Sequence, residues 1–187
     1  MPHSIQDFKS SLIGGGARPN LFEVTIPAPP ASISLTANFP ILCKAAALPA
    51  SNIGSIDVPF RGRIFKVAGD RTYDTWTITI INDQTFQIRD AMERWMQRIG
   101  QYGDGSGDTN PASYMCDAHV QQFKRRSSSL GKDTPTGAGL QYAASYKFYD
   151  IFPTNISAID LSYDSSDTIE EFTVEFQVQY WTPTTRV

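Results

Sequence analysis

Two stretches of strict alternation between apolar and polar residues constrain the fold of this chain more than any other feature. In the C-terminal stretch the apolar residues are Phe172, Val174, Phe176, Val178 and Tyr180, and the residues between them are all polar. In the other stretch Trp76, Ile78 and Ile80 alternate with Thr75, Thr77 and Thr79. Because successive side chains of a β-strand point to opposite faces, this period predicts strands with one buried and one polar face. A buried face requires a second layer, so the chain is expected to fold mainly as β-structure.

Similar but weaker patterns predict the remaining elements. The expected strands cover residues 21–26, 39–47, 62–68, 73–82, 114–123, 141–152, 158–163 and 172–180. Loops are expected at 27–38, 48–60 and 102–111, a hairpin tip at 124–140 and a turn at 164–167, because Gly, Pro, Ser and Asn interrupt the patterns there. A helix is expected over 85–99, where apolar residues form one stripe, with Asp83 as its N-cap and Gly100 just past its end. We therefore predict an antiparallel β-sandwich or barrel with one flanking α-helix.

The first 19 residues have a different character and are expected to form an N-terminal arm, with the domain proper over residues 20–187. Residues 4–13 carry apolar side chains at roughly helical spacing, which predicts a short amphipathic turn that docks on another surface. Gly14, Gly15 and Gly16 are expected to form a flexible joint, and Pro19 stops any helix that precedes it.

Charge and cysteine content exclude several classes of protein. The formal net charge of −3 argues against a dedicated nucleic-acid-binding protein, which needs an excess of Lys and Arg over acids. Cys43 and Cys116 are expected to be reduced thiols in the core rather than a disulfide framework. No run of 18 apolar residues and no signal pattern is present, so we expect assembly in a cytoplasm and no membrane binding.

No arrangement of residues indicates catalysis, a cofactor or a metal, so no catalytic, cofactor-binding or metal-binding residue is predicted and no enzyme activity is expected. His3 and His119 are the two histidines, and His119 is expected to face solvent or a neighbour. Cys116 and Asp117 should point to opposite sheet faces, which argues against a metal cluster with His119. The Asp104–Asp108 stretch lacks the ligand spacing of a calcium loop and is expected to be a solvated turn.

Several segments in fixed order resemble the tail tube proteins of contractile, myovirus-type bacteriophages. They are ARPNLFEV (17–24), LCKAAALPAS (42–51), VPFRGRIFKVAGDRTYDTWTITIINDQ (58–84), the helix segment that ends at Trp95, and FPTNISAIDLSYDSSDTIEEFTVEFQVQYW (152–181). The resemblance implies hexameric rings that stack into the inner tail tube of a virion, through which DNA passes without tight binding. It also implies contact with sheath, baseplate, tail terminator and tape measure proteins. Residues 27–38 and 101–142 depart from the family pattern.

The residues suggest how such a tube would be built. Exposed strand edges invite pairing with other chains, and pairing around a ring leaves no edge open. Residues 48–63 are expected either to reach the next ring or to form an ordinary covered loop. Strand faces such as the one bearing Thr75, Thr77 and Thr79 are expected to give a polar and acidic lumen, because cations there would hold phosphate. Gly69, Asp70 and Arg71 are either an inter-subunit anchor or a β-turn.

Three alternatives remain open at this point. The chain could be the tube subunit of a phage-derived contractile injection particle or a secretion system, with the same fold and another cargo. It could be a tube-end adaptor that forms single rings. A carbohydrate-binding or hydrolytic sandwich would need aromatic side chains around a cleft or paired carboxylates, for which Tyr102, Tyr114 and Glu93 are candidates.

Overall fold

The computed structural model describes residues 4–12, 16–31, 33–124 and 142–186. Its strands are β1 (Phe22–Thr25), β2 (Cys43–Ala46), β3 (Ser51–Phe60), β4 (Arg63–Tyr73), β5 (Trp76–Ile81), β6 (Cys116–Phe123), β7 (Tyr142–Ile156), β8 (Glu171–Gln177) and β9 (Tyr180–Arg186). Its helices are α1 (Ile5–Ser11), α2 (Phe39–Leu42), α3 (Gln87–Ile99) and α4 (Pro111–Tyr114).

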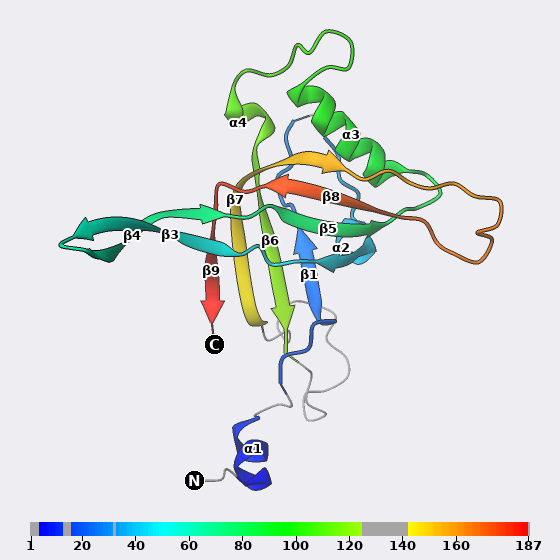
Figure 1. Ribbon diagram of the computed structural model, residues 1–187. Coiled ribbons are helices and arrows are strands. Elements are labelled where there is room, and N and C mark those ends of the chain that lie inside the picture. The colour runs from blue at the N-terminus through cyan, green and yellow to red at the C-terminus, as the bar shows by residue number, and fades with distance from the viewer. Residues whose placement is uncertain (1–3, 13–15, 32, 125–141, 187) are drawn as a thin grey trace.

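Two antiparallel sheets that share strand β7 form the body of the molecule. Sheet A has the order β1–β6–β7–β9, and sheet B has the order β2–β5–β8–β7. In Figure 1 the first part of β7 runs beside β6 and β9, and its last part turns to run beside β8. Asp150 lies at this corner with a positive φ of 53°, and its N–H points to a carboxylate oxygen of Asp117 at 3.4 Å. The predicted antiparallel sandwich with a flanking helix is therefore confirmed, with the corner made by a strand that changes sheets.

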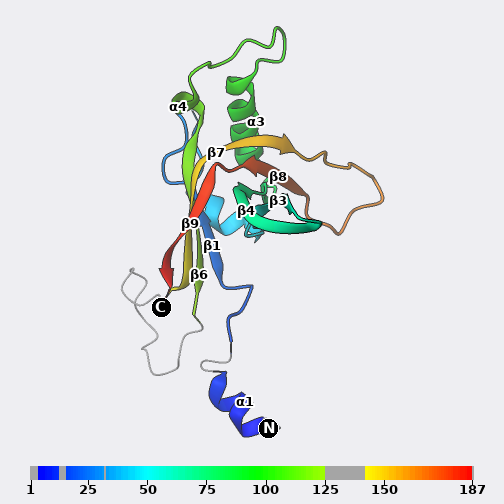
Figure 2. The ribbon, with the colours of Figure 1, turned by 60° about the vertical axis from the view of Figure 1, so that its left-hand side comes forward.

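Aromatic side chains join the two sheets and the long helix into one core. The Trp76 ring stacks on Phe148 of sheet A with centroids 4.8 Å apart and lies 5.3 Å from Phe176 of sheet B. Trp95 of α3 packs 5.9 Å from Phe176 and donates its indole N–H to the Tyr114 carbonyl at 2.7 Å. Helix α3 thus covers the same face of sheet B that sheet A covers (Figure 2). The opposite face of sheet B is left free of these layers.

Helix α3 begins two residues later than predicted, and Asp83 is not its cap. The backbone folds into a turn in which Phe86 donates its N–H to the Asp83 carbonyl, and Phe86 takes a left-handed φ of 54° just before the helix. The Asp83 carboxylate accepts the Thr85 hydroxyl instead of a helix N–H. The buried stripe is close to the expected one, and Gly100 ends the helix in an extended conformation. The buried residues of α3 are Ile88, Ala91, Met92 and Trp95.

Two expected strands begin with a helical turn instead. Residues 39–47 form α2 followed by the short strand β2, and residues 114–123 form the end of α4 followed by β6. Each helical turn has a proline in its first turn, Pro40 or Pro111, where the missing proline N–H costs no intrahelical bond. The side chain of Asn110 also caps α4 by accepting the Ala112 N–H.

Several other predicted boundaries between strands and loops were wrong for one reason. A segment forms a strand only where a neighbouring strand offers it hydrogen-bond partners. The expected loop 48–60 is largely strand β3, and the strand expected at 62–68 extends to Tyr73 as β4. The strand expected at 73–82 starts only at Trp76. The strand expected at 158–163 is a loop in the structure, and the final strand divides into β8 and β9 as the chain passes from sheet B to sheet A.

The segment expected to form an N-terminal arm contains the predicted helical turn. Helix α1 starts at a capping box in which Ser4 accepts the Asp7 N–H while the Asp7 carboxylate accepts the Ser4 N–H. Its apolar side chains Ile5 and Phe8 are exposed. The predictions made for Gly14, Gly15, His3 and residues 125–140 of the expected hairpin tip at 124–140 fall outside the described residues.

The loop after α3 returns tightly to the end of that helix, and Gly107 makes this possible. Asp108 donates its N–H to the Arg98 carbonyl at 3.0 Å, and a Cβ placed on Gly107 would lie 2.0 Å from the Ile99 carbonyl oxygen. We expect Gly107→Ala to lower the free energy of unfolding by about 2–3 kcal/mol, because backbone must move to relieve the overlap. Thermal unfolding followed by circular dichroism measures this.

The matched control is Gly103→Ala in the same loop, where an added Cβ meets nothing within 4 Å. Gly103→Ala should leave the melting temperature within about 2 °C of the parent, since surface substitutions away from special features change stability little. Equal melting temperatures for the two variants would contradict the close approach at Gly107.

Candidate assembly surface

The two borders of sheet B have no strand partner within the described chain. At one border, Ala47 donates its N–H to the Thr77 carbonyl at 3.1 Å. Since bonded and non-bonded residues alternate along an antiparallel pair, the N–H of Ala46 points away from β5 toward the open side. At the other border, Ser157 donates to the Thr173 carbonyl at 2.8 Å, so the N–H of Ile156 points outward in the same way. Sheet B therefore offers unpaired backbone groups on both sides.

The face of sheet B that turns away from the core is mostly polar and carries two glutamates, Glu171 and Glu175. Thr77 lies opposite Glu175, Thr79 opposite Thr173, and Ile81 opposite Glu171. These side chains are half-buried, in contrast to their fully buried strand neighbours. The Lys44 ammonium pairs with the Glu171 carboxylate. The predicted row of hydroxyls is thus confirmed for Thr77 and Thr79, whereas Thr75 precedes the strand and is exposed.

Strands β3 and β4 form a hairpin that projects from the body and pairs only with itself in the described structure (Figure 1). Its two-residue turn consists of Arg61 and Gly62, both with positive φ (46° and 80°), as the tight hairpin turns of twisted strands require. The cross-strand pairs Ile56–Val67 and Val58–Phe65 fall on one face together with Phe60. All five of these apolar side chains are exposed, Phe60 by 65% and Phe65 by 66%. An apolar face of this kind marks an interaction surface.

The segment Gly69–Asp70–Arg71 lies inside β4, so its interpretation as a β-turn was wrong. The register of the hairpin shifts between Ile53 and Ser55, which is a β-bulge. Gly54 lies in this bulge, and a Cβ on Gly69 would come within 3.3 Å of the Gly54 carbonyl oxygen and of the Ile56 side chain. The anchor role suggested for Asp70 and Arg71 stays a prediction.

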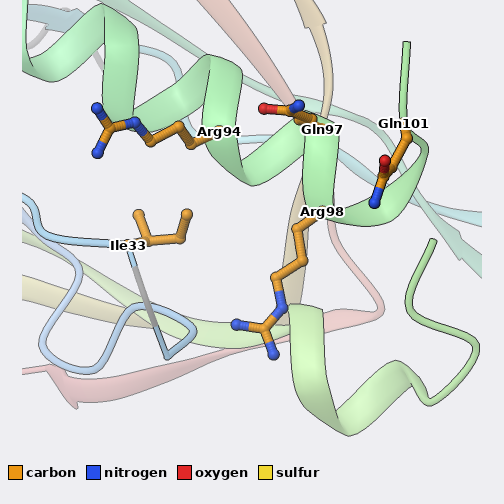
Figure 3. A pocket seen from close by; sticks show the side chains of 5 residues that line it. All are labelled: Ile33, Arg94, Gln97, Arg98 and Gln101. Atoms are coloured by element: carbon orange, nitrogen blue, oxygen red, sulfur yellow. The ribbon is translucent and has the colours of Figure 1, made fainter. Parts of the chain in front are cut away.

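A shallow hollow lies between the C-terminal half of α3 and the chain around Ile33 (Figure 3). Arg98 reaches into it, but its guanidinium already binds the Asp108 carboxylate and the Ala31 carbonyl. The hydrogen bond from Arg98 and a second from Ser113 lower the pKa of Asp108. These contacts hold the chain at Ala31 and at Asp108 against α3, which is a structural role.

The residues considered for chemistry are not brought together. Cys116 is buried in β6 while Asp117 and His119 lie on the opposite face, and Asp117 pairs with Lys147 at 2.8 Å. Glu93 pairs with Arg89 at 2.8 Å, and Tyr114 packs edge-on against Phe152. Within residues 104–108 the Asp104 carboxylate accepts the Ser106 N–H and hydroxyl, which lowers its pKa and makes the predicted solvated turn. No group of three or more His, Cys, Asp or Glu side chains gathers in the described part of the chain.

Both cysteines are free and buried, as the sequence predicts. Burial raises the pKa of each thiol to about 12, and for Cys116 the nearby Asp117 and Asp150 add to the effect. Of the described helices, none is long and apolar enough to cross a membrane.

Neither thiol should react with a disulfide reagent at pH 8 while the protein is folded. A thiol pKa near 12 instead of near 9 makes the thiolate about 1000-fold rarer at that pH, and the thiolate is the reactive form. Both should react at once in denaturant. Because ionisation above pH 9 favours the unfolded chain, the free energy of unfolding should also fall between about pH 9 and 12. Rapid labelling of native protein would contradict the burial.

Strand β3, the first strand of the projecting hairpin, was expected to be a loop. The loop was expected because Gly54 and Pro59 interrupt strands in most sequences. In the structure Gly54 lies in a bulge, and Pro59 lies on a strand that has a partner on one side only. The Arg61–Gly62 dipeptide between two apolar runs was a usable turn signal.

Comparison with known proteins identifies related chains. The family model described as phage tail tube protein matches residues 17–184. The tail tube protein gp19 of Enterobacteria phage T4 is 34% identical over 168 residues, which cover 90% of this chain and 92% of that protein. The tail tube protein of Serratia phage KSP90 is 25% identical over 178 residues, 93% of each chain.

Solved structures share the fold at low sequence identity. The anti-feeding prophage cap (a tube-terminating cap) superposes with a TM-score of 0.60 at 16% identity over 91% of each chain. A chain of the sheath–tube complex of an extracellular contractile injection system gives 0.58 at 12% identity over 100% of each chain. The family match over nearly the whole chain and the identity to the T4 protein show that this chain belongs to the phage tail tube protein family.

Proposed function

We propose that this tail tube protein closes into hexameric rings by strand pairing, and that the rings stack into the inner tube of a contractile tail. The observation that carries this is the pair of open borders of sheet B, one on β2 and one on the last part of β7. Pairing of one border with the opposite border of the next copy is a heterologous contact, and such contacts close into a ring when the rotation permits. The ring then has one continuous sheet with no free edge.

The polar face of sheet B would line the channel of this ring. The core, sheet A and α3 occupy its other face, so a closed sheet B would have the Thr77, Thr79 and Glu175 face as its inner surface. Acids and hydroxyls there would repel or ignore phosphate, which suits a channel for passing DNA. The same channel would accommodate a tape measure protein during assembly. Helix α3 would lie on the outside of the ring, toward a sheath.

The remaining partners follow from the tube itself. Its two ends would contact baseplate and tail terminator proteins, and the N-terminal arm (residues 1–19) would dock its exposed Ile5 and Phe8 on a neighbouring copy of the tail tube domain (residues 20–187). Membership of a structural family indicates a non-enzymatic role. Likeness to injection-system structures at 12–16% identity supports the fold alone, whereas the relatives at higher identity are phage tail proteins.

The direct test is negative-stain electron microscopy of the purified chain together with its mass in solution. Rings or hollow tubes of uniform diameter are expected, with a solution mass that is a multiple of six chains. A protein that stays monomeric at high concentration would contradict the proposal, and closed rings of another copy number would correct it.

A further inference from the structure

The short helix α2 lies beside the open border of β2, on the core side of sheet B. It ends at Leu42, and β2 begins at the next residue, Cys43. Phe39 in its first position is 2% exposed and belongs to the core, and the helix packs against β1 and β2. Figure 1 shows α2 at the β2 side of the sheet, whereas α3 packs against β7 at the other side.

Ile41 is the apolar side chain of α2 that points away from the core. It is 80% exposed, although Phe39 in the same turn is buried. The two positions differ by about 200° around a helix, so the side chains project to opposite sides. A single exposed isoleucine is common on protein surfaces and indicates nothing by itself. Ile41, however, lies next to an unpaired strand edge, and a chain that pairs with this edge would also come close to Ile41.

The other open border of sheet B carries apolar side chains on the same side of the sheet. Ile156 lies opposite Val174, which is fully buried, so Ile156 also faces the core side. Ile156 and Ile159 pack against the core but remain partly exposed, and we call these two residues the border patch. The first turn of α3 lies beside them, because the Arg89 guanidinium donates to the Ser157 carbonyl at 3.3 Å.

The directions of the strands determine which segments meet when two copies pair. Neighbouring strands are antiparallel throughout the series β2, β5, β8 and the last part of β7. Strand β2 of one copy would therefore run antiparallel to the last part of β7 of the next copy. In an antiparallel pair, the chain that precedes one strand and the chain that follows the other lie at the same end. Helix α2 precedes β2, and Ile156 and Ile159 lie at and just after the end of β7, so α2 would meet the border patch.

We propose that Ile41 of one copy packs on the border patch of the next copy, so that an apolar layer continues from subunit to subunit around the ring. The proposal rests on the ring closure set out under Proposed function and adds a side-chain contact to the pairing of backbones. Backbone groups alone would let any exposed strand pair with the border of β2. An isoleucine that must reach an apolar patch favours the border of another copy and one register of the strands.

The first test replaces Ile41 with aspartate in the full chain. Ile41→Asp loses the apolar contact and places a charge against the border patch, so association at each ring interface should weaken roughly 10- to 100-fold. Solution mass measured against protein concentration reports this as a shift from rings to monomers. Ile41→Val keeps an apolar side chain and should assemble like the parent. The matched control Tyr102→Asp changes a side chain that is 75% exposed in the loop after α3, and it should form rings normally.

The second test is chemical cross-linking between neighbouring copies. Ile41→Cys/Ala158→Cys places one thiol on each side of the proposed contact, because Ala158 is exposed between the two residues of the border patch. Cys43 and Cys116 are buried and should not react in the folded protein. A short bismaleimide should link assembled chains into a ladder of up to six on a denaturing gel. Ile41→Cys alone and Ala158→Cys alone should give no ladder, because the thiols of like residues lie far apart in the ring.

The outcomes separate this inference from the ring proposal. A wild-type chain that forms no rings overturns both. Rings that Ile41→Asp forms at parental concentration, or intact rings of the double cysteine variant that give no ladder, overturn the contact of Ile41 with the border patch and leave ring closure standing. Thermal unfolding followed by circular dichroism shows whether the Ile41→Asp monomer is folded. If it is not, the cross-linking result decides.

Discussion

Replacing Ala46 with proline should abolish ring formation while leaving the folded monomer intact. The Ala46 N–H points to the open border of β2, so proline removes no hydrogen bond within the chain. In a closed ring the same position becomes the interior of a continuous sheet, where proline leaves a partner carbonyl without its donor and its ring collides with the adjacent strand. An unsatisfied buried carbonyl costs about 1–3 kcal/mol, roughly 5- to 150-fold in affinity at every interface of the ring.

The control is Ala46→Ser, which keeps the N–H and a small side chain and should assemble like the parent. Solution mass and electron microscopy distinguish rings from monomers, and thermal unfolding of dilute protein shows whether the Ala46→Pro monomer is as stable as the Ala46→Ser monomer. Rings formed by Ala46→Pro at parental concentration would mean that β2 is not a ring border. A large loss of monomer stability would mean that the border is not open.

The sequence predicts best the elements whose burial is decided within the chain. Strands β5 and β8 and helix α3 have one fully buried face, so their apolar periods of 2 and 3.6 residues stand out. The helix N-terminus was misplaced because Asp83 instead serves a turn, which no periodicity reveals. The helical turns α2 and α4 were missed because a single turn beginning at proline shows no period.

The assembly surface was predicted only in outline, because its residues are exposed when the chain is considered alone. The hairpin β3–β4 has no buried position, so its apolar and polar residues follow the needs of a partner rather than of the core. The reverse error occurred at residues 158–163, where Leu161 and Tyr163 alternate with polar residues as in a strand but lie exposed in a loop. Both errors fall on segments that project from the body, where patterns of burial within one chain give no guidance.

Placing lysines on the channel face should convert the tube from one that releases DNA to one that retains it. Thr79→Lys/Glu175→Lys changes two half-buried positions on the face of sheet B that turns away from the core and would line the channel. Each lysine would recur around every ring. Each phosphate contact adds about −0.9 to the slope of log affinity against log salt, so several contacts raise affinity by orders of magnitude at low salt. Tubes assembled with short DNA fragments should protect that DNA from nuclease at 50 mM salt and release it at high salt.

The matched control places the same two changes on the outward face of sheet A, as Glu23→Lys/Thr25→Lys in β1, with an equal change in charge. Those tubes should bind DNA only on their outer surface, where nuclease digests it, and wild-type tubes should protect none. Protection by the control equal to that of the channel variant, or none by either, would show that the Thr79 and Glu175 face does not line the lumen. Because the two variants differ only in which sheet carries the charge, this experiment assigns the lumen to one face of one sheet.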